Sequence, residues 1–233
     1  MLDGAKCPLY MIEMIYFKKI LTFRTLFHLY LPKLNFASAK LLNMPQVCHT
    51  DCATPYGEVL GVTAGNVIAY SNCNAHCLRF EPHYNNGFYT GIQWQCVEFT
   101  RRWLLSQRGV IYGEVDFASD IWHKINRVIR VADGKAFQFQ SHPNGSTHPP
   151  QVGNLLIYDK TLFNTGHVAV VTNVDLEAGL IRVAEQNFFN QKWVGDYARE
   201  IKLLKKQDRY WLWDVYLLGW KQIKPNPQLI SHS

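Results

Sequence analysis

The sequence lacks several features that would place it in a particular class of protein. It has no internal repeat and no base-reading motif, and its apolar runs stop short of the roughly 18–20 residues that a membrane-spanning helix needs. Six cysteines in 233 residues are too few for a small disulfide scaffold. We therefore exclude a repeat protein and a disulfide scaffold, and we expect no stable membrane span and no nucleic-acid partner.

Composition and charge divide the chain into three parts. A hydrophobic content of 48% is ample for a core. Residues 1–45 hold six basic and two acidic side chains and so account for +4 of the net charge of +6. We expect a basic, apolar extension at 1–45, a compact domain at 46–224 and a tail at 225–233. The extension shows no small-residue cleavage pattern of a secretory signal, so we expect a cytoplasmic protein, and the extension either packs loosely or directs the protein to an organelle.

Four of the cysteines form two closely spaced pairs. Cys48 and Cys52 are separated by three residues, as are Cys73 and Cys77, and histidines flank both pairs. This spacing permits a zinc site. The surrounding sequence is loop-like, and reduced, unpaired thiols of a cytosolic protein are the reading we favour. We expect neither a metal nor another cofactor.

Hydrophobic periodicity and turn residues place the secondary structure. In the second half of the chain, apolar and polar residues alternate, as they do in the strands of an antiparallel sheet. Strands are expected at 57–62, 67–70, 155–158, 167–174, 180–187 and 211–220, helices from Cys96 to Gly109 and over 117–128, and loops at 71–86 and 141–151.

The helix that starts at Cys96 carries a cysteine in its first turn. Phe99 and Trp103 fall on the same helical face as Cys96, and Gly109 is a typical helix stop. The positive end of the helix dipole favours the thiolate form of a cysteine placed there. The alternative is a buried cysteine that serves as a small hydrophobic residue.

A hairpin brings a histidine and a carboxylate together. The strands at 167–174 and 180–187 are joined by five residues, so residue i pairs with a partner near 354 − i. His167 then faces Asn187, with Glu185 one step along the same face. Together with Cys96, this is the arrangement of Cys-His-carboxylate acyl transfer.

Each residue in this arrangement has an expected role. His167 takes the proton of Cys96, and Glu185 orients and stabilises the imidazolium ring. The backbone N–H of Cys96 and the side-chain amide of Gln95 stabilise the oxyanion. The following Glu98, Arg101 and Arg102 form either a solvated helix face or a site where an arginine binds a substrate carboxylate.

Six ordered motifs between Thr54 and Trp220 resemble a known family. They are WQCVEFTRR (94–102), HPNGS (142–146), LLIY (155–158), TGHVA (165–169), RVAEQN (182–187) and LGW (218–220). The order from cysteine to histidine to glutamate is similar to that of the CHAP superfamily of papain-like amidohydrolases and peptidases. The motifs most closely resemble the amidase domain of glutathionylspermidine and trypanothione synthetase/amidases.

The resemblance implies a fold, an activity and a substrate. The fold is α+β and papain-like, with an N-terminal nucleophile helix packed on an antiparallel sheet. The activity is hydrolysis of the amide between the glycine carboxyl of glutathione and a spermidine amine, so the expected partner is a small glutathione–polyamine conjugate. The catalytic residues are then Cys96, His167 and Glu185, with Gln95 at the oxyanion, Asn187 as support and Arg101 at the glutathione moiety.

The chain also departs from this family. Family members commonly join the amidase to a C-terminal ATP-grasp synthetase domain, whereas this chain ends soon after Trp220, so we expect hydrolysis and no synthesis. Residues 1–45 and the loop from Cys73 to Cys77 have no counterpart that we recognise. Two alternatives follow: a CHAP peptidoglycan hydrolase, disfavoured by the lack of a secretory signal and of a wall-binding domain, and a silent binding module, disfavoured by the complete triad.

Overall fold

The computed structural model describes residues 46–224, and the expected extension (1–45) and tail (225–233) lie outside them. The domain limits therefore stay a prediction. Most of the described chain forms one nine-stranded sheet in the order β12-β11-β10-β9-β8-β13-β7-β6-β5, and every neighbouring pair is antiparallel. Its strands are β5 (Val110–Ile111), β6 (Arg127–Arg130), β7 (Ala136–Pro143), β8 (Leu155–Tyr158), β9 (Val168–Asp175), β10 (Leu180–Ala184), β11 (Arg199–Lys206), β12 (Arg209–Leu212) and β13 (Leu217–Ile223).

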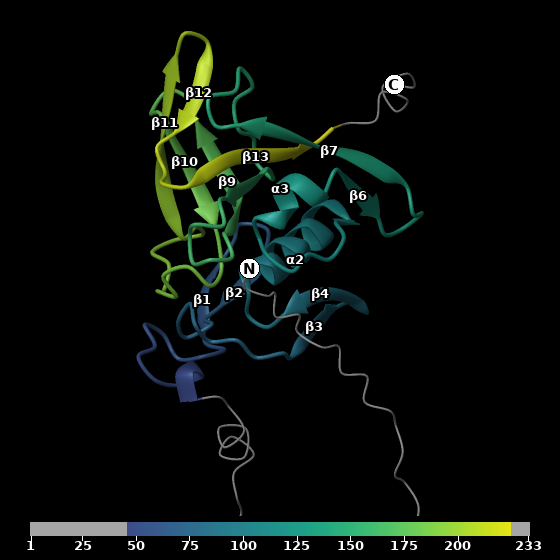
Figure 1. Cartoon of the computed structure of the whole chain (residues 1–233), viewed down its shortest axis with the longest axis vertical. Helices are drawn as coiled ribbons and strands as arrows, with labels where there is room; N and C mark the ends of the chain where they lie inside the picture. Colours follow the sequence, from purple (N-terminus) through teal and green to yellow (C-terminus); the bar gives the residue numbers. More distant parts are fainter. Residues whose placement is uncertain (1–45, 225–233) are drawn as a thin grey trace, which may run out of the picture.

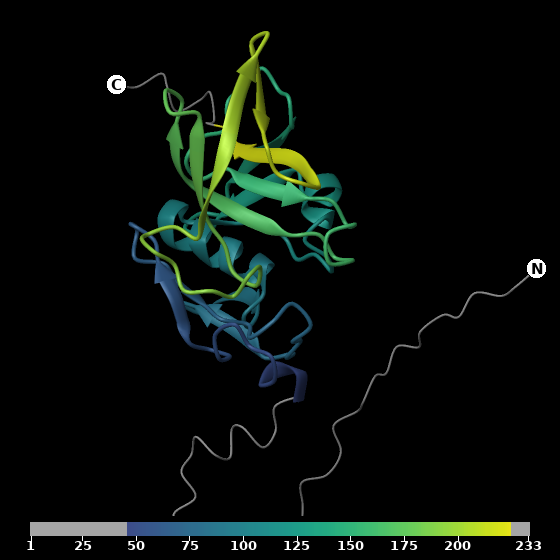
Figure 2. The same ribbon diagram turned by 90° about the vertical axis from the view of Figure 1, so that its left-hand side faces the viewer.

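Two smaller hairpins and two α-helices complete the described part. The hairpins pair β1 with β2 and β3 with β4, all antiparallel. Helix α2 lies between the large sheet and the two hairpins (Figures 1 and 2) and packs against β4, β5 and β9. The remaining elements are η1 (Gln46–Cys48), β1 (Val59–Val62), β2 (Ile68–Tyr70), β3 (Pro82–Asn85), β4 (Phe88–Ile92), α2 (Cys96–Arg108) and α3 (Asp120–Lys124).

The fold agrees in outline with the α+β expectation. It has a large antiparallel sheet with few helices, and β8 is buried along its whole length because side chains cover both faces of the sheet. Within residues 46–224, neither α-helix combines the length and the apolar character that a membrane crossing requires.

Helix α2 forms as its sequence predicts. Phe99 and Trp103 are buried in the same hydrophobic cluster as Cys96. Gly109 ends the helix with a left-handed φ of 62°, and its N–H bonds back to carbonyls of the last turn. The helix is therefore anchored by one apolar face, with Cys96 at its N-terminal end.

The prediction of a helix over residues 117–128 is largely wrong. Helix α3 covers only five residues, Asp120–Lys124, and Arg127–Arg130 form strand β6. Val128 and Ile129 are β-branched and pair with β7, so backbone hydrogen bonds in the sheet outweigh a helical apolar stripe.

The loop predicted over 71–86 ends earlier than expected. Its last residues form β3, which pairs with β4 around a turn at Asn86 and Gly87. Both turn residues have positive φ, as a tight two-residue hairpin requires. The hairpin was missed because its strands lack a clear apolar alternation.

Three further boundaries differ from the prediction. The strand expected at 180–187 ends at Ala184, and Asn187 has a left-handed φ of 56°, so the expected pairing of Asn187 with His167 is not formed. The expected loop at 141–151 begins inside β7, which continues to Pro143 as the partner of β13. The single strand expected at 211–220 is two strands, separated by a bend at which Tyr216 has a φ of 63°. Trp213 in that bend is 71% exposed, so alternation in the sequence did not correspond to burial there.

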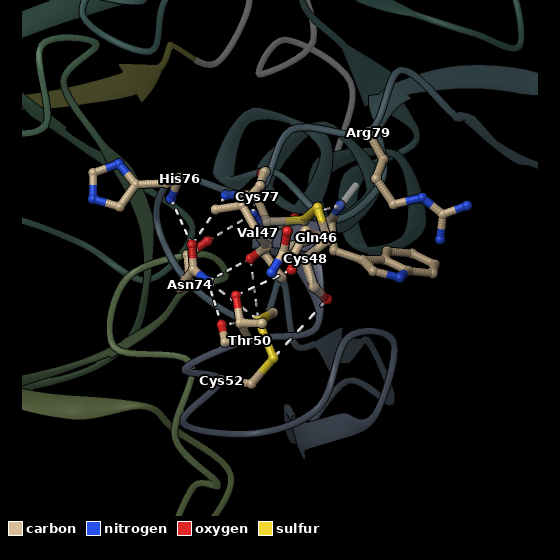
Figure 3. Close-up of a disulfide and its surroundings, with 12 residues drawn as sticks. Gln46, Val47, Cys48, Thr50, Cys52, Asn74, His76, Cys77 and Arg79 are labelled. Carbon is tan, nitrogen blue, oxygen red and sulfur yellow. Dashed lines mark hydrogen bonds between the residues drawn. A yellow bond between two sulfur atoms is a disulfide. The ribbon is translucent and has the colours of Figure 1, made fainter. Parts of the chain in front are cut away.

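The prediction of reduced, unpaired cysteines is wrong. Cys48 is disulfide-bonded to Cys77, and Cys52 is disulfide-bonded to Cys73, so the four sulfurs are not zinc ligands (Figure 3). The sequence suggested that cysteines with three residues between them belong together. The disulfides instead join cysteines 29 positions apart (Cys48–Cys77) and 21 positions apart (Cys52–Cys73). Such bridges are typical of oxidising compartments, so the expected cytoplasmic location loses the support that reduced thiols gave it.

Candidate active site

Cys96 lies at the start of α2, where the first backbone N–H groups of the helix have no intrahelical partner. Among residues 46–224, it is the cysteine that remains outside a disulfide. Its side chain is 8% exposed and lines a cavity of about 240 Å³. The thiol is thus shielded from bulk water but open to a ligand-sized space.

His167 and Glu185 meet at the adjoining ends of β9 and β10. Val183 pairs with Val171 and Ala184 with Val170, which confirms the 354 − i register beside the site. His167 Nε2 lies 2.9 Å from Glu185 Oε2, and both side chains are buried. An ionised carboxylate only accepts hydrogen bonds, so Nε2 carries the hydrogen and Nδ1 is left to face the thiol.

Cys96 and Glu185 both interact with the His167 ring. Burial of the imidazole opposes its charged form, but the interactions with Cys96 and Glu185 raise the pKa of His167 to about 9. The imidazolium is therefore stable at neutral pH. Among the residues predicted for the site, the structure brings Cys96, His167 and Glu185 together, with a hydrogen bond between His167 and Glu185.

Gly166 lets the chain bring His167 close to β8 and α3. It has a φ of 73°, and a Cβ built on it would lie 2.6 Å from the carbonyl oxygen of Tyr158 and 2.9 Å from Ser119. A larger residue would be strained twice, by its backbone conformation and by these contacts. Position 166 therefore requires glycine.

A charged network behind Glu185 was missed by the sequence analysis. Arg199 Nε donates to Glu185 Oε1 at 2.6 Å, and its Nη1 donates to Asp214 Oδ2 at 2.6 Å. Arg199 Nη2 also donates to the Tyr158 hydroxyl, which itself donates to Asp214. The available signal was the sheet register, because Arg199 pairs with Val183, two residues before Glu185.

This network keeps the buried Glu185 ionised. Burial alone would raise the pKa of Glu185, but the hydrogen bond from His167 and the charge of Arg199 lower it below its ordinary value. In return, the carboxylates raise the pKa of Arg199. Glu185 therefore holds its negative charge against His167 across the neutral range.

Gln95 and Asn187 are joined by their side-chain amides. Asn187 Nδ2 donates to Gln95 Oε1 at 2.8 Å. Gln95 Nε2 donates to the Cys77 carbonyl at 3.2 Å and to Asn72 Oδ1 at 3.3 Å. The Gln95 amide is thus held next to Cys96 by the loop that contains Cys77.

The side chains of Glu98, Arg101 and Arg102 are all buried. The first of the two readings given for them, a solvated helix face, is therefore wrong. Glu98 accepts hydrogen bonds from Arg102 and from Gln186, which tie α2 to the end of β10. Burial opposes ionisation of Glu98, but its bonds with His83 and Arg102 lower its pKa. These contacts fix the orientation of the helix that carries Cys96.

Arg101 is the residue predicted to contact the substrate. Two of its guanidinium nitrogens already donate hydrogen bonds to backbone carbonyls. Nη1 donates to the Tyr112 carbonyl at 2.7 Å and Nη2 to the Tyr89 carbonyl at 3.0 Å. Its Nε has no hydrogen-bond partner among residues 46–224, and the side chain lines the same cavity as Cys96. Arg101 thus braces the cavity wall and presents one unused donor.

The cavity beside Cys96 combines apolar walls with charges of both signs. Its basic side chain is Arg101, and its acidic ones include Glu114 and Asp116. A larger cavity of about 350 Å³, lined by Arg108 and Arg130 among others, contains none of the predicted catalytic residues. We therefore take the smaller cavity as the candidate substrate site.

Comparison with known proteins supports the same region. Residues 84–187 match the CHAP domain. The chain is 34% identical over 158 residues to trypanothione synthetase of Crithidia fasciculata, covering 67% of this chain and 24% of that protein. It is 33% identical over 185 residues to the bifunctional glutathionylspermidine synthetase/amidase of Escherichia coli (strain K12), covering 71% of this chain and 29% of that protein.

A third relative, glutathionylspermidine synthase of Crithidia fasciculata, is 34% identical over 195 residues, 73% of this chain and 27% of its own length. The chain thus spans less than a third of the length of these curated relatives. The CHAP match includes Cys96, His167 and Glu185. Over residues 84–187 the chain is similar to the CHAP domain, and over a longer stretch it is similar to part of the trypanothione and glutathionylspermidine synthetases.

Proposed function

We propose that this protein is a cysteine amidase that hydrolyses the amide bond of glutathione–polyamine conjugates, with glutathionylspermidine as the model substrate. The observation that carries the proposal is the buried line from Cys96 through His167 to Glu185, with the thiol at a helix N-terminus beside a cavity. A thiol, a histidine and a carboxylate in this order would support thiol hydrolysis of the papain type. The names of the relatives supply the substrate class.

The first half of the reaction forms a thioester. His167 holds the proton of Cys96, and the thiolate attacks the amide carbon while the carbonyl electrons move to oxygen. When the tetrahedral intermediate collapses, the C–N bond breaks and the imidazolium gives its proton to the leaving amine. A high His167 pKa suits this step, because the ring stays protonated until the amine departs.

The second half returns the enzyme to its starting state. Neutral His167 takes a proton from water, and the hydroxide attacks the thioester carbon. The C–S bond then breaks, releasing the glutathione carboxylate and restoring the thiolate beside the imidazolium. Glu185 stays ionised throughout and stabilises the positive ring, as the third member of a triad does.

Stabilisation of the oxyanion falls to groups at the start of α2. The backbone N–H of Cys96 is one donor, and the Gln95 side-chain amide is the second. Asn187 supports Gln95 by bonding to its oxygen, which leaves the nitrogen as the donating atom. Gln95 Nε2 carries two hydrogens. We assign one to the long bonds with Asn72 and the Cys77 carbonyl, 3.3 and 3.2 Å, and the other to the oxyanion.

The charges of the cavity suit a substrate with both carboxylates and ammonium groups. The unused Arg101 Nε is available to a glutathione carboxylate, while Glu114 and Asp116 offer negative charge to a polyamine. The proposal is tested by incubating the purified protein with glutathionylspermidine and measuring release of glutathione and spermidine. Release that persists in the Cys96→Ala protein would contradict the assignment of the nucleophile.

A peptidoglycan amidase is the second candidate, and the two disulfides favour it. They are typical of an oxidising compartment, and peptidoglycan lies outside the cytoplasm. A cytoplasmic location stays a prediction for the conjugate amidase. Parallel assays on glutathionylspermidine and on purified peptidoglycan, with Cys96→Ala as the common control, separate the two: cleavage of peptidoglycan alone would overturn the conjugate assignment.

A further inference from the structure

One of the two disulfides holds Cys77, whose carbonyl oxygen accepts a hydrogen bond from Gln95 at the start of α2. The two disulfides join the segment around η1 to residues 71–77, and Cys48, Cys73 and Cys77 are buried. We call residues 71–77 the stapled loop. Asn74 reinforces the staple by donating to the carbonyls of Val47 and Thr50 (Figure 3). This loop is therefore fixed both covalently and by hydrogen bonds.

Asn72 connects the stapled loop to the candidate active site. Its side chain is fully buried, and Oδ1 accepts hydrogen bonds from the Trp94 backbone N–H and from Gln95 Nε2, both at 3.3 Å. Its Nδ2 donates to the Cys77 carbonyl at 2.7 Å and to Asn187 Oδ1 at 3.1 Å. One amide thus contacts the two residues that precede Cys96, the stapled loop and Asn187.

These bonds close a ring around the Gln95 side chain. Gln95 Oε1 accepts from Asn187, and Gln95 Nε2 donates to Asn72 and to the Cys77 carbonyl. That carbonyl belongs to a residue held by a disulfide. A donor stabilises an oxyanion efficiently when it is oriented before the reaction, so the groups that orient Gln95 affect the rate.

We propose that Asn72 is a positioning residue which, together with the disulfide-bonded Cys77, orients Gln95 for stabilisation of the oxyanion. The disulfides then contribute to catalysis in addition to stability. This inference rests on the proposed amidase function for its natural substrate. It requires no titrating group, because every member of the ring is a neutral amide or carbonyl.

The main test is the Asn72→Ala substitution. We expect kcat for glutathionylspermidine to fall about 10- to 100-fold, less than the roughly 10²- to 10³-fold loss expected for Gln95→Ala, with KM nearly unchanged. The pH profile and the rate of Cys96 alkylation by iodoacetamide should stay the same, because both depend on His167. Asn144→Ala is the matched control, since Asn144 also exchanges two side-chain bonds with backbone, at Leu212, away from the site.

A double-mutant cycle tests whether Asn72 acts through Gln95. In Gln95→Ala protein, Asn72→Ala should cost little further activity, because the side chain it orients is absent. A loss that stays undiminished in that background would overturn the proposal, as would a kcat for Asn72→Ala no lower than that of Asn144→Ala.

The disulfides provide a second set of variants. Replacing Cys48 and Cys77 by serine should lower kcat more than replacing Cys52 and Cys73, because Cys77 carries the carbonyl bonded to Gln95. Equal losses would contradict the assigned role of that carbonyl. Melting temperatures identify any variant that fails to fold.

The same variants should be measured with p-nitrophenyl acetate, which acylates a reactive thiol irrespective of the natural substrate. The rate of the p-nitrophenol burst depends on the Cys96 thiolate and on the oxyanion donors, and does not depend on recognition of the natural substrate. If the wild type shows this burst but does not cleave glutathionylspermidine, the proposed substrate is wrong, and the burst rates of the variants still decide the role of Asn72. A burst that is equal in wild type and Asn72→Ala would overturn that role.

Discussion

The two sides of the candidate active site are held by different kinds of interaction. On one side, His167 and Glu185 stand at the ends of paired strands, backed by the buried charges of Arg199 and Asp214. On the other side, Gln95 is surrounded by neutral amides and by a loop that two disulfides fasten. On the first side, charged groups raise the pKa of His167, whereas on the second side hydrogen bonds hold the Gln95 side chain.

The difference explains why the first side is built into the sheet. A buried ion pair needs partners at fixed distances to offset its desolvation, and sheet register supplies them. Neutral amides are less costly to bury than charged groups, but their hydrogen bonds are weaker and hold them in place less firmly. Covalent bridges in the stapled loop supply the missing rigidity on that side.

The largest expected effect comes from breaking the catalytic line itself. Cys96→Ala and His167→Ala should each lower kcat by about 10⁴-fold or more, which corresponds to about 5.4 kcal/mol in the activation barrier. Release of glutathione measures the effect. His142→Ala is the control, because His142 is also buried but lies outside the site. Comparable losses in all three variants would show a defect in folding and not in chemistry.

Removing Arg199 tests the charged side. Arg199→Ala leaves Glu185 buried without its main countercharge, so the free energy of unfolding should fall by about 3–5 kcal/mol. Arg182→Ala is a matched control on the neighbouring strand, because its pair with Glu200 is exposed and should contribute at most about 1 kcal/mol. Urea denaturation of both proteins gives the comparison. Equal effects would mean that the Arg199 network is not a buried ion pair in solution.

Removing one disulfide tests the neutral side. Serine at Cys52 and Cys73 should lower the free energy of unfolding by about 2–4 kcal/mol, the usual contribution of a bridge that closes such a loop. The pH at which activity is half lost in alkali should not change, because no charge near His167 is altered. A shifted midpoint would show that the two sides are electrostatically coupled.

The smallest expected effect is a shift in pH dependence. The pKa of His167 is raised from 6.5 to about 9, so its contribution to stability is complete below about pH 6.5 and is lost as the pH rises through about 9. Activity should fall over the same alkaline range, because neutral His167 cannot protonate the leaving amine.

Glu185→Gln sharpens that prediction. Without the carboxylate, the alkaline midpoint should move down by about one unit or more, equivalent to about 1.4 kcal/mol. Glu200→Gln, on the exposed face of β11, is the control and should leave the midpoint in place. Activity profiles from pH 4 to 11 would measure both, and an unchanged midpoint in Glu185→Gln would contradict the charge pairing assigned to His167.

The parts of the site that sequence reasoning reached depend on local patterns. The helix from Cys96 to Gly109 follows from its apolar face and its glycine stop, and the His167–Glu185 pairing follows from one hairpin. Both involve contacts between residues close in the sequence, where periodicity and turn length constrain the geometry. The prediction of a helix over 117–128 failed because the structure of residues 127–130 depends on pairing with β7, which the local pattern does not show.

The sequence by itself determined the helix that begins at Cys96, the hairpin that brings His167 close to Glu185, and the likeness to CHAP amidases. The tertiary structure decided which cysteines are bridged, that Arg199 backs Glu185, and that Asn72 holds Gln95. The physical reason is the separation in sequence over which each interaction acts. Periodicity and hairpin length act through neighbouring residues, whereas a disulfide or a buried ion pair depends on where distant segments meet after the chain has folded.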